Sequence, residues 1–346
     1  MTLAPESPIR VPADWPRQRP CKLAFVAEAP GEYEIGWTPN PKPLVGPSGV
    51  VFNQLLRAAN IDRAEVLVTN VYDQKAPGND VGPWMRDEAF TRPYLSRLAN
   101  EIEKSDPALI VTLGSASLWA LTGETNVGQH RGSPFLATRT AVGRKIVPTY
   151  HPSFVQRTWK MFGTVVADFV KAAALAEKPR SEPIGWSKRE IWIEPTLSDL
   201  MEFEDRFIAK ADFITIDIET MPGARQIKCV GFGVDAVTAI VVPFVDWRKP
   251  SRSYWNDPGD EVKAWAWVER QCASPKPKLM QNGVYDAFWL WDRMGIAVMN
   301  YSEDTRLIHH VLYPELPKSL EYMGGRYLVQ QPWKRWGRRK EEKRDA

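Results

Sequence analysis

The stretch Leu23-Ala24-Phe25-Val26-Ala27-Glu28-Ala29-Pro30-Gly31-Glu32-Tyr33-Glu34 decides the fold of the first half of the chain. Residues 23–27 form a continuous apolar run, which predicts a short buried strand. Apolar residues at helical spacing follow over 49–60, so a loop rich in acidic residues, proline and glycine joins the strand to a helix. Such a loop brings main-chain amides and carboxylates to the end of the strand, where parallel sheets bind ligands.

The same alternation of strand and helix returns along the first half. Further apolar runs predict buried strands over 66–71, 108–113 and 146–150. Helical patterns cover 115–121, which opens with a serine cap, and 159–176. Alternating strands and helices are typical of a parallel sheet covered on both faces. We therefore predict a three-layer α/β domain with a parallel sheet.

The second half of the chain predicts another α/β domain with a mixed sheet. Its expected strands are 191–194, 213–220, 230–234 and 239–244, and its expected helices are 197–208, 260–271, 284–294, 304–312 and 319–328. The predicted organisation is a Pro-rich leader over 1–20, a first domain over 21–177, a linker over 178–190, a second domain over 191–332 and a basic tail over 333–346.

Composition narrows the class of protein. The net charge of +3 permits a polyanionic partner without demanding one. The three cysteines, Cys21, Cys229 and Cys272, form no closely spaced pair, so we expect neither a disulfide framework nor a cysteine metal cage. No apolar run approaches the roughly 20 residues of a membrane span. We expect a soluble, cytoplasmic protein in a reducing compartment.

Polar motifs follow the ends of the predicted strands in the first half. They are EAPGEYE over 28–34, PLVGPSG over 43–49, Thr69-Asn70-Val71 with Pro77-Gly78-Asn79, LIVTLG over 109–114, and HPSF over 151–154. Because the carboxyl ends of parallel strands meet at one edge of a sheet, these motifs are expected to lie together. Taken singly, each is also what an ordinary turn would contain.

In this order, the motifs over residues 22–175 resemble those of uracil-DNA glycosylases of the iron–sulfur type, family four. The resemblance implies hydrolysis of the N-glycosidic bond of a flipped uracil in DNA. It implies that Glu34, supported by Glu28, positions water or steadies the cationic sugar, and that His151 stabilises the departing base. Asn70 would read the uracil edge, and Asn79 falls on a second active-site asparagine. The other implied contacts are Ala29, Pro30 and Gly31 of the first loop, Leu44 beside the base, Ser153 on a phosphate and Phe154 as a wedge.

The chain departs from that family at three places: the cluster cysteines, Leu44, and a longer loop between Glu34 and Pro43 that contains Trp37. The family binds a cluster through four cysteines, whereas residues 72–75 here contain none, so we predict that no iron–sulfur cluster is bound. Leu44 stands where an aromatic side chain normally stacks on uracil, and Trp37 is the candidate to replace that ring.

Carboxylates in the second half suggest a metal site. Asp217 and Glu219 lie two residues apart on an apolar strand, so both point to the same face. With Asp286 and Asp304 they resemble the metal ligands of the DnaQ-like, ribonuclease-H-like proofreading exonuclease domain of family A DNA polymerases, over about residues 190–328. The resemblance implies Mg²⁺ or Mn²⁺ and 3′-to-5′ exonuclease activity. The last motif of that family, YxxxD, is missing unless Asp345 is its remnant, so we expect a truncated domain.

Two functions remain open from the sequence. The first is a DNA repair or replication enzyme that excises uracil, with single- or double-stranded DNA as its partner. The second is a noncatalytic DNA-binding or polymerase-docking subunit. The fusion of the two domains resembles the front end of some bacteriophage family A polymerases, which predicts a separate DNA polymerase chain as partner.

Overall fold

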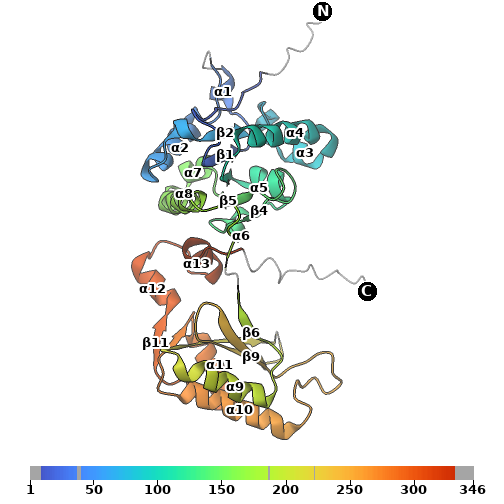
Figure 1. Ribbon diagram of the computed structural model, residues 1–346, viewed down its shortest axis with the longest axis vertical. Coiled ribbons are helices and arrows are strands. Elements are labelled where there is room, and N and C mark those ends of the chain that lie inside the picture. The colour runs from blue at the N-terminus through green and yellow to red at the C-terminus, as the bar shows by residue number, and fades with distance from the viewer. Residues whose placement is uncertain (1–8, 37–39, 186–187, 222, 332–346) are drawn as a thin grey trace, which may run out of the picture. The chain divides into compact units, whose positions relative to one another are not determined.

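The computed structural model describes residues 9–36, 40–185, 188–221 and 223–331. It divides into two compact units (Figure 1). Unit 1 comprises Met1–Gly185 and Glu321–Ala346, and unit 2 comprises Trp186–Leu320. Trp37, Asp345 and the basic tail lie outside the described residues.

Unit 1 is built on a five-stranded sheet in the order β2-β1-β3-β5-β4. Its strands are β1 (Leu23–Ala27), β2 (Leu67–Asn70), β3 (Leu109–Leu113), β4 (Phe135–Leu136) and β5 (Lys145–Thr149). All neighbours pair in parallel except β4, which is antiparallel to β5. Apart from β4, the strands were expected from the apolar runs.

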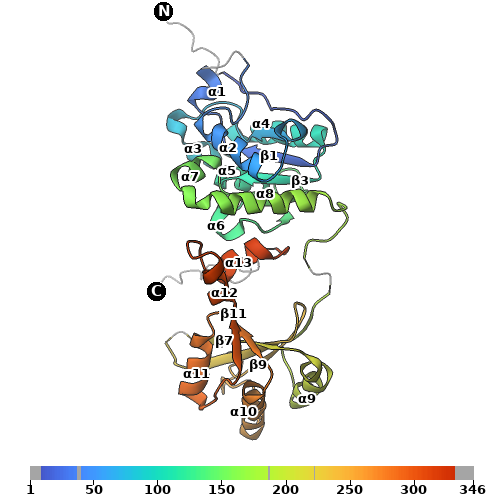
Figure 2. The same ribbon diagram turned by 90° about the vertical axis from the view of Figure 1, so that its left-hand side faces the viewer.

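Helices cover both faces of this sheet, which confirms the predicted three-layer α/β class. Phe25 of β1 packs with Phe52 and Phe169 on the face covered by α2 (Pro47–Ala58), α7 (Pro152–Arg157) and α8 (Phe162–Ala176). Figure 2 shows α8 running across that face. The alternate β1 residues, Ala24 and Val26, pack on the other face against α4 (Glu88–Ser105) and α5 (Ser115–Thr122). The shorter helices are α1 (Glu32–Gly36), α3 (Gly82–Arg86) and α6 (Val127–His130), with 3₁₀ turns at Arg63–Glu65, Pro77–Asn79 and Trp159–Met161.

Part of the predicted leader belongs to this sheet. Asp14 exchanges two backbone hydrogen bonds with Val68, at 2.8 and 2.9 Å. Further along, Arg10 bridges to Gln74, and the amide of Val11 donates to the carbonyl of Asp73 at 2.7 Å. The leader thus covers the outer edge of β2, an edge that would otherwise leave backbone groups unpaired.

The C-terminal helix α13 (Leu320–Tyr327) differs from the expected domain boundary, because the structure groups residues from Glu321 onward with unit 1. The hydroxyl of Tyr322 lies 2.7 Å from that of Thr164 on α8. Lys171 Nζ donates to the carbonyls of Gly132 and Leu328 at 3.0 and 3.2 Å. The first unit therefore includes a segment that follows the second unit in sequence.

A buried ion pair lies under α13. Arg131 and Asp168 are each at most 2% exposed and are joined through Nε and Oδ2 at 3.1 Å. The guanidinium lies 4.6 Å from the ring centroid of Tyr322, and Thr149 donates to Asp168 at 2.7 Å. Charges this deeply buried are tolerated only when they are paired and hydrogen-bonded.

Unit 2 contains a six-stranded mixed sheet in the order β11-β10-β7-β8-β9-β6. The strands are β6 (Glu190–Trp192), β7 (Ile214–Thr220), β8 (Ile227–Gly233), β9 (Thr238–Pro243), β10 (Lys278–Met280) and β11 (Tyr301–Asp304). β8 is antiparallel to both β7 and β9, and the other pairs are parallel. The predicted mixed sheet is confirmed, although β10 and β11 were not expected. The helices are α9 (Leu197–Arg206), α10 (Pro258–Ala273), α11 (Val284–Met294) and α12 (Thr305–Leu312), with a 3₁₀ turn at Ile208–Lys210.

Candidate active site in unit 1

A cleft of about 690 Å³ opens at the carboxyl ends of the parallel strands, where the fold predicts a ligand site. The predicted residues on its wall are Glu28, Ala29, Pro30, Gly31, Glu34, Leu44, Asn79, His151, Ser153 and Phe154. The cleft thus gathers residues from the first loop, from the turn before α2 and from the loop after β5, which are far apart in sequence.

His151 is held as a neutral imidazole with a free donor. Its Nδ1 accepts the backbone N–H of Ser153 at 3.2 Å, and the Ser153 hydroxyl lies 2.8 Å from the same atom. Since a backbone N–H can only donate, Nδ1 is the acceptor and the proton of the neutral ring sits on Nε2. Burial, followed by the charge of Arg157, lowers the pKa of His151 to about 4. Nε2 is buried and has no hydrogen-bond partner among the described residues.

Glu34 joins two loops through its carboxylate. It is 4% exposed and accepts the amide of Gly31 at 2.8 Å and the amide of Gly46 at 3.3 Å, one on each oxygen. Gly31 also leaves space for this carboxylate, because a Cβ there would fall 2.9 Å from Oε2. Glu34 therefore fixes the first loop against the turn that precedes α2.

Glu28 differs from Glu34 in its surroundings. It lies at the end of β1, half-buried on the cleft wall. Burial, with a smaller contribution from the charge of Asp80, raises its pKa above the ordinary value. This carboxylate has lost hydration without a compensating cation among the described residues, which favours its protonated form and strengthens it as a base.

Asn70 ends β2 but does not line the cleft. Its side chain is 3% exposed, and Nδ2 is buried without a partner in the described part of the chain. Asn70 pairs with Ala27, so it lies one strand away from Glu28. The structure therefore brings Glu34 and His151 to one cleft, whereas Asn70 is not among the residues that line it.

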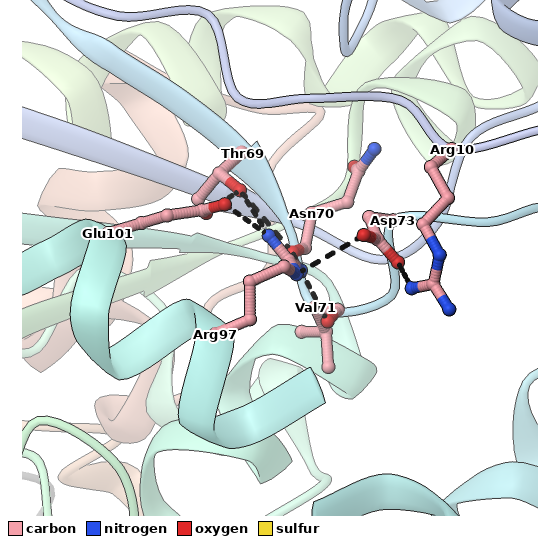
Figure 3. A network of polar contacts seen from close by, with 7 residues as sticks. All are labelled: Arg10, Thr69, Asn70, Val71, Asp73, Arg97 and Glu101. Carbon is pink, nitrogen blue, oxygen red and sulfur yellow. Dashed lines mark hydrogen bonds and ion pairs between the residues drawn. The ribbon is translucent and has the colours of Figure 1, made fainter. Parts of the chain in front are cut away.

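Arg97 of α4 fixes the end of β2. Its Nη2 donates to the carbonyls of Asn70 and Val71 at 2.7 and 2.9 Å. Figure 3 shows the guanidinium on one side of the strand and the Asn70 side chain pointing away from it. The charge of Arg97 is balanced by Glu101, and Asp73 lies between Arg97 and Arg10. An ion-pair network thus holds the backbone from which Asn70 projects.

Leu44 forms part of the cleft wall with an uncommon backbone. It is 4% exposed and has φ +54°, the left-handed region that costs a non-glycine residue about 1–2 kcal/mol. Asn79, also on the wall, has φ +58°, which asparagine adopts more readily.

Ser153 and Phe154 make contacts that the sequence did not indicate. The Ser153 hydroxyl is engaged with His151, and the ring of Phe154 packs on that of Tyr150 with centroids 4.7 Å apart.

Asn126 and Val127 at the start of α6 also line the cleft. The sequence did not indicate them because they follow a helix, whereas the polar motifs follow strand ends. The expected serine cap of α5 is wrong, since Gly114 with φ +90° occupies the cap and makes no side-chain bond.

Comparison with known proteins places the first half of the chain in a family. Residues 18–174 match the model of the uracil DNA glycosylase superfamily. A type-4 uracil-DNA glycosylase of Thermotoga maritima is 32% identical over 161 residues, which are 45% of this chain and 79% of the relative. One from Archaeoglobus fulgidus is 26% identical over 162 residues, which are 45% of this chain and 78% of the relative. The chain belongs to the uracil DNA glycosylase superfamily.

Solved structures of the EXD2 exonuclease domain were also found. The one soaked in Mg has a TM-score of 0.27 and 14% identity, and covers 39% of this chain and 68% of that chain. The one soaked in Mn and GMP has a TM-score of 0.27 and 13% identity, and covers 44% and 77%. These scores are too low to bear on activity.

The residues of this superfamily member do not fit an iron–sulfur cluster. Such clusters are held by cysteine thiolates. Cys21 and Cys272 are buried and Cys229 is half-buried, and burial raises the pKa of all three thiols. Asp73, in the run that lacks cysteine, is instead engaged by Arg10.

The structure does not gather the four predicted metal ligands of unit 2. Within the ranges that the structure describes, no group of three or more acidic, histidine or cysteine side chains could hold a metal ion. Asp304 instead caps α12, accepting the amide of Arg306 at 2.7 Å, and it also accepts the amide of Gly283 at 3.0 Å. The sequence could not distinguish this cap from a ligand, because both use a carboxylate at a strand end.

The predicted arrangement of metal ligands is met more closely at Asp217, Glu219 and Asp286. Asp217 and Glu219 are exposed on one face of β7, and Asp286 accepts the amide of Ile218 at 2.9 Å. Burial raises the pKa of Asp286 to about 6, and the charges of Asp217 and Asp304 act in the same direction.

Among the described helices of either unit, none has both the length and the apolar character needed to cross a bilayer.

Proposed function

We propose that unit 1 hydrolyses the N-glycosidic bond of a uracil flipped out of DNA. The observation that carries the proposal is His151, a neutral imidazole whose buried Nε2–H has no partner in the part of the chain that the structure describes and lies in a cleft shared with two carboxylates. A donor without a partner in a buried site costs free energy, which a ligand acceptor would recover.

The chemistry of base release suits this donor. Cleavage of the bond leaves negative charge on uracil, which spreads onto its carbonyl oxygens. A fixed N–H placed at such an oxygen stabilises the transition state more than the ground state. Neutral His151 supplies that donor at all pH values well above 4, and Ser153 keeps the ring in the required tautomer.

We assign the two carboxylates differently from the sequence-based choice. Glu28 lines the cleft and has a raised pKa, so it would position the attacking water or steady the cationic sugar. Glu34, with each oxygen on a backbone amide, would hold the loops in register. Asn70 would read the base edge, with Arg97 fixing its backbone, and Asn79 would contribute from the opposite loop.

The remaining wall residues would receive the base and the backbone around it. Leu44, Ala29, Pro30 and Gly31 would enclose the flipped base. Phe154 would fill the vacated stack. Ser153 would reach a phosphate only if it released His151, so we assign its first role to the imidazole.

The test is base release from single- and double-stranded oligonucleotides that contain one uracil. We expect abasic sites with the wild-type protein and a loss of about 10²–10³ in kcat for His151→Ala, typical of removing one oxyanion donor. Activity that survives both His151→Ala and Glu28→Gln would refute the site. DNA binding without base release by the wild-type protein would favour the noncatalytic subunit.

For unit 2 we propose a divalent-ion site at Asp217, Glu219 and Asp286. This site would support 3′-to-5′ exonuclease activity that depends on Mg²⁺ or Mn²⁺. The supporting observation is that Asp286 accepts the amide of Ile218 on β7 and that burial, followed by the charges of Asp217 and Asp304, raises its pKa, which a bound cation would offset. Titration with Mn²⁺ should raise the melting temperature of the wild-type protein but not of Asp217→Asn. The exposed carboxylate variant Asp292→Asn is the control, and equal responses of all three proteins would end the proposal. A separate polymerase chain remains a prediction from the resemblance.

A further inference from the structure

The turn at Pro43 and Leu44 has a strained backbone that must be held by contacts with other parts of the chain. Leu44 adopts the left-handed backbone region, which leucine avoids, while its side chain is buried on the cleft wall. Its carbonyl packs directly on Gly49, where an added Cβ would fall 2.2 Å from the oxygen. A conformation of this kind persists only where the surroundings hold it.

Arg63 holds this turn. Its Nη2 donates to the carbonyl of Pro43 at 2.6 Å, and its Nη1 donates to the carbonyl of Leu44 at 2.9 Å. Nη1 also donates to Asn53 Oδ1 on α2 at 3.0 Å. The planar guanidinium can span two successive carbonyls because its donors are fixed in a fork, which an ammonium group lacks.

The leader orients Arg63 in turn. Asp14 Oδ2 accepts Arg63 Nε at 3.2 Å, and Asp14 Oδ1 accepts Lys42 Nζ at 2.8 Å. Because the backbone of Asp14 is bonded to Val68 of β2, this carboxylate is fixed to the sheet. The guanidinium of Arg63 therefore ties the carbonyls of Pro43 and Leu44 to the core of unit 1.

We propose that Arg63 is a positioning residue that sets the apolar wall of the base pocket through Leu44. The proposal rests on the proposed glycosylase function. The wall would contact the base equally in the ground state and the transition state, so its loss should act on binding. Arg63 does not line the cleft, and its effect on the base passes through the backbone of Leu44.

The kinetic test uses the full chain and a single-stranded oligonucleotide containing one uracil. For Arg63→Met we expect KM to rise about tenfold with kcat changed less than about twofold, the signature of lost uniform binding. Arg63→Lys should fall between, because it supplies a charge without the fork. In a Leu44→Ala background, Arg63→Met should add little, since the wall is already lost.

The matched control is Arg139→Met. Arg139 has similar exposure, 27% against 22% for Arg63, and its guanidinium pairs with Glu88 and lies 4.1 Å from the ring centroid of Trp119, away from the cleft wall. This variant should lose stability without a change in KM. An Arg63→Met effect that is equally large in the Leu44→Ala background would overturn the proposal.

A second measurement separates this proposal from the proposed function. The Leu44 methyl resonances in ¹³C-labelled protein should shift in Arg63→Met and stay unchanged in Arg139→Met. If the wild-type protein releases no uracil, the proposed function fails, and the methyl shifts still decide the role of Arg63. Unmoved Leu44 methyl signals in Arg63→Met would overturn that role whatever the activity.

Discussion

At the scale of single residues, His151 links protonation to folding. Its pKa of about 4 lies below the ordinary value of 6.5, so the unfolded chain binds a proton that the folded chain refuses between these pH values. The stability that the neutral His151 contributes is therefore fully present above about pH 6.5, and it is lost as the pH falls toward 4.

The first prediction follows from that linkage. Lowering the pH from 7 to 5 should reduce the free energy of unfolding by about 2 kcal/mol through His151 alone. His151→Asn should remove this part of the pH dependence, as measured by urea denaturation at each pH. Identical pH profiles for the two proteins would mean that the imidazole is not held neutral.

The second prediction separates the two carboxylates. Glu28→Gln should lower kcat by about 10²-fold or more with little change in melting temperature, since Glu28 faces the cleft. Glu34→Gln should lower the free energy of unfolding by about 1–3 kcal/mol, because its carboxylate accepts two backbone amides and an amide side chain offers only one acceptor. The reverse pattern would restore the sequence-based choice of Glu34 as the reacting group.

Sequence reasoning reached most residues of this cleft but not the contacts that hold them. Motif order placed Glu28, Glu34 and His151 at one sheet edge, because parallel strands end there. The amides that occupy Glu34 and the left-handed backbone of Leu44 depend on contacts between distant loops. No local pattern encodes such contacts, so they could be known only from the coordinates.

At the scale of elements, apolar runs predicted most of the strands, but the helical periodicity of apolar residues did not reveal α4. That helix carries Pro93 and many charged residues, and it buries only a narrow stripe that includes Leu98 and Ile102. A weak stripe interrupted by proline gives little periodic signal. The short strands β10 and β11 were missed for a similar reason, since three or four residues are too few to show a period.

The third prediction concerns the contact between α13 and unit 1. A Cβ at Gly325 would fall 2.4 Å from the carbonyl oxygen of Arg131, so Gly325→Ala should cost about 1–3 kcal/mol of stability. Gly163→Ala on α8 is the control, since a Cβ there meets nothing within 4 Å and should add about 0.5–1 kcal/mol. Calorimetry that ranks the two variants equally would argue against close packing of α13.

At the scale of the whole molecule, unit 2 is inserted between two parts of unit 1 in sequence. The predicted boundaries assumed that each domain is continuous, which is the usual arrangement. The return of α13 was not predictable because its docking depends on Arg131, Asp168 and Lys171, which carry no sign of a distant partner in sequence.

The fourth prediction tests this arrangement. A protease site inserted between Gly185 and Lys188 would let the chain be cut after folding. The two fragments should remain together in size-exclusion chromatography, because residues from Glu321 onward belong to unit 1. The same cut in Gly325→Ala should release them more readily, whereas separation of the wild-type fragments would show that α13 does not hold.

The Asp14 carboxylate has a practical consequence for anyone who shortens this protein. The similarity to the superfamily begins at residue 18, which invites a start there. Such a version would lose the acceptor of the Arg63 Nε–H together with the backbone that covers the outer edge of β2. We expect it to release uracil less well than the longer chain while every wall residue is still present, so a weak assay result from it would understate the enzyme.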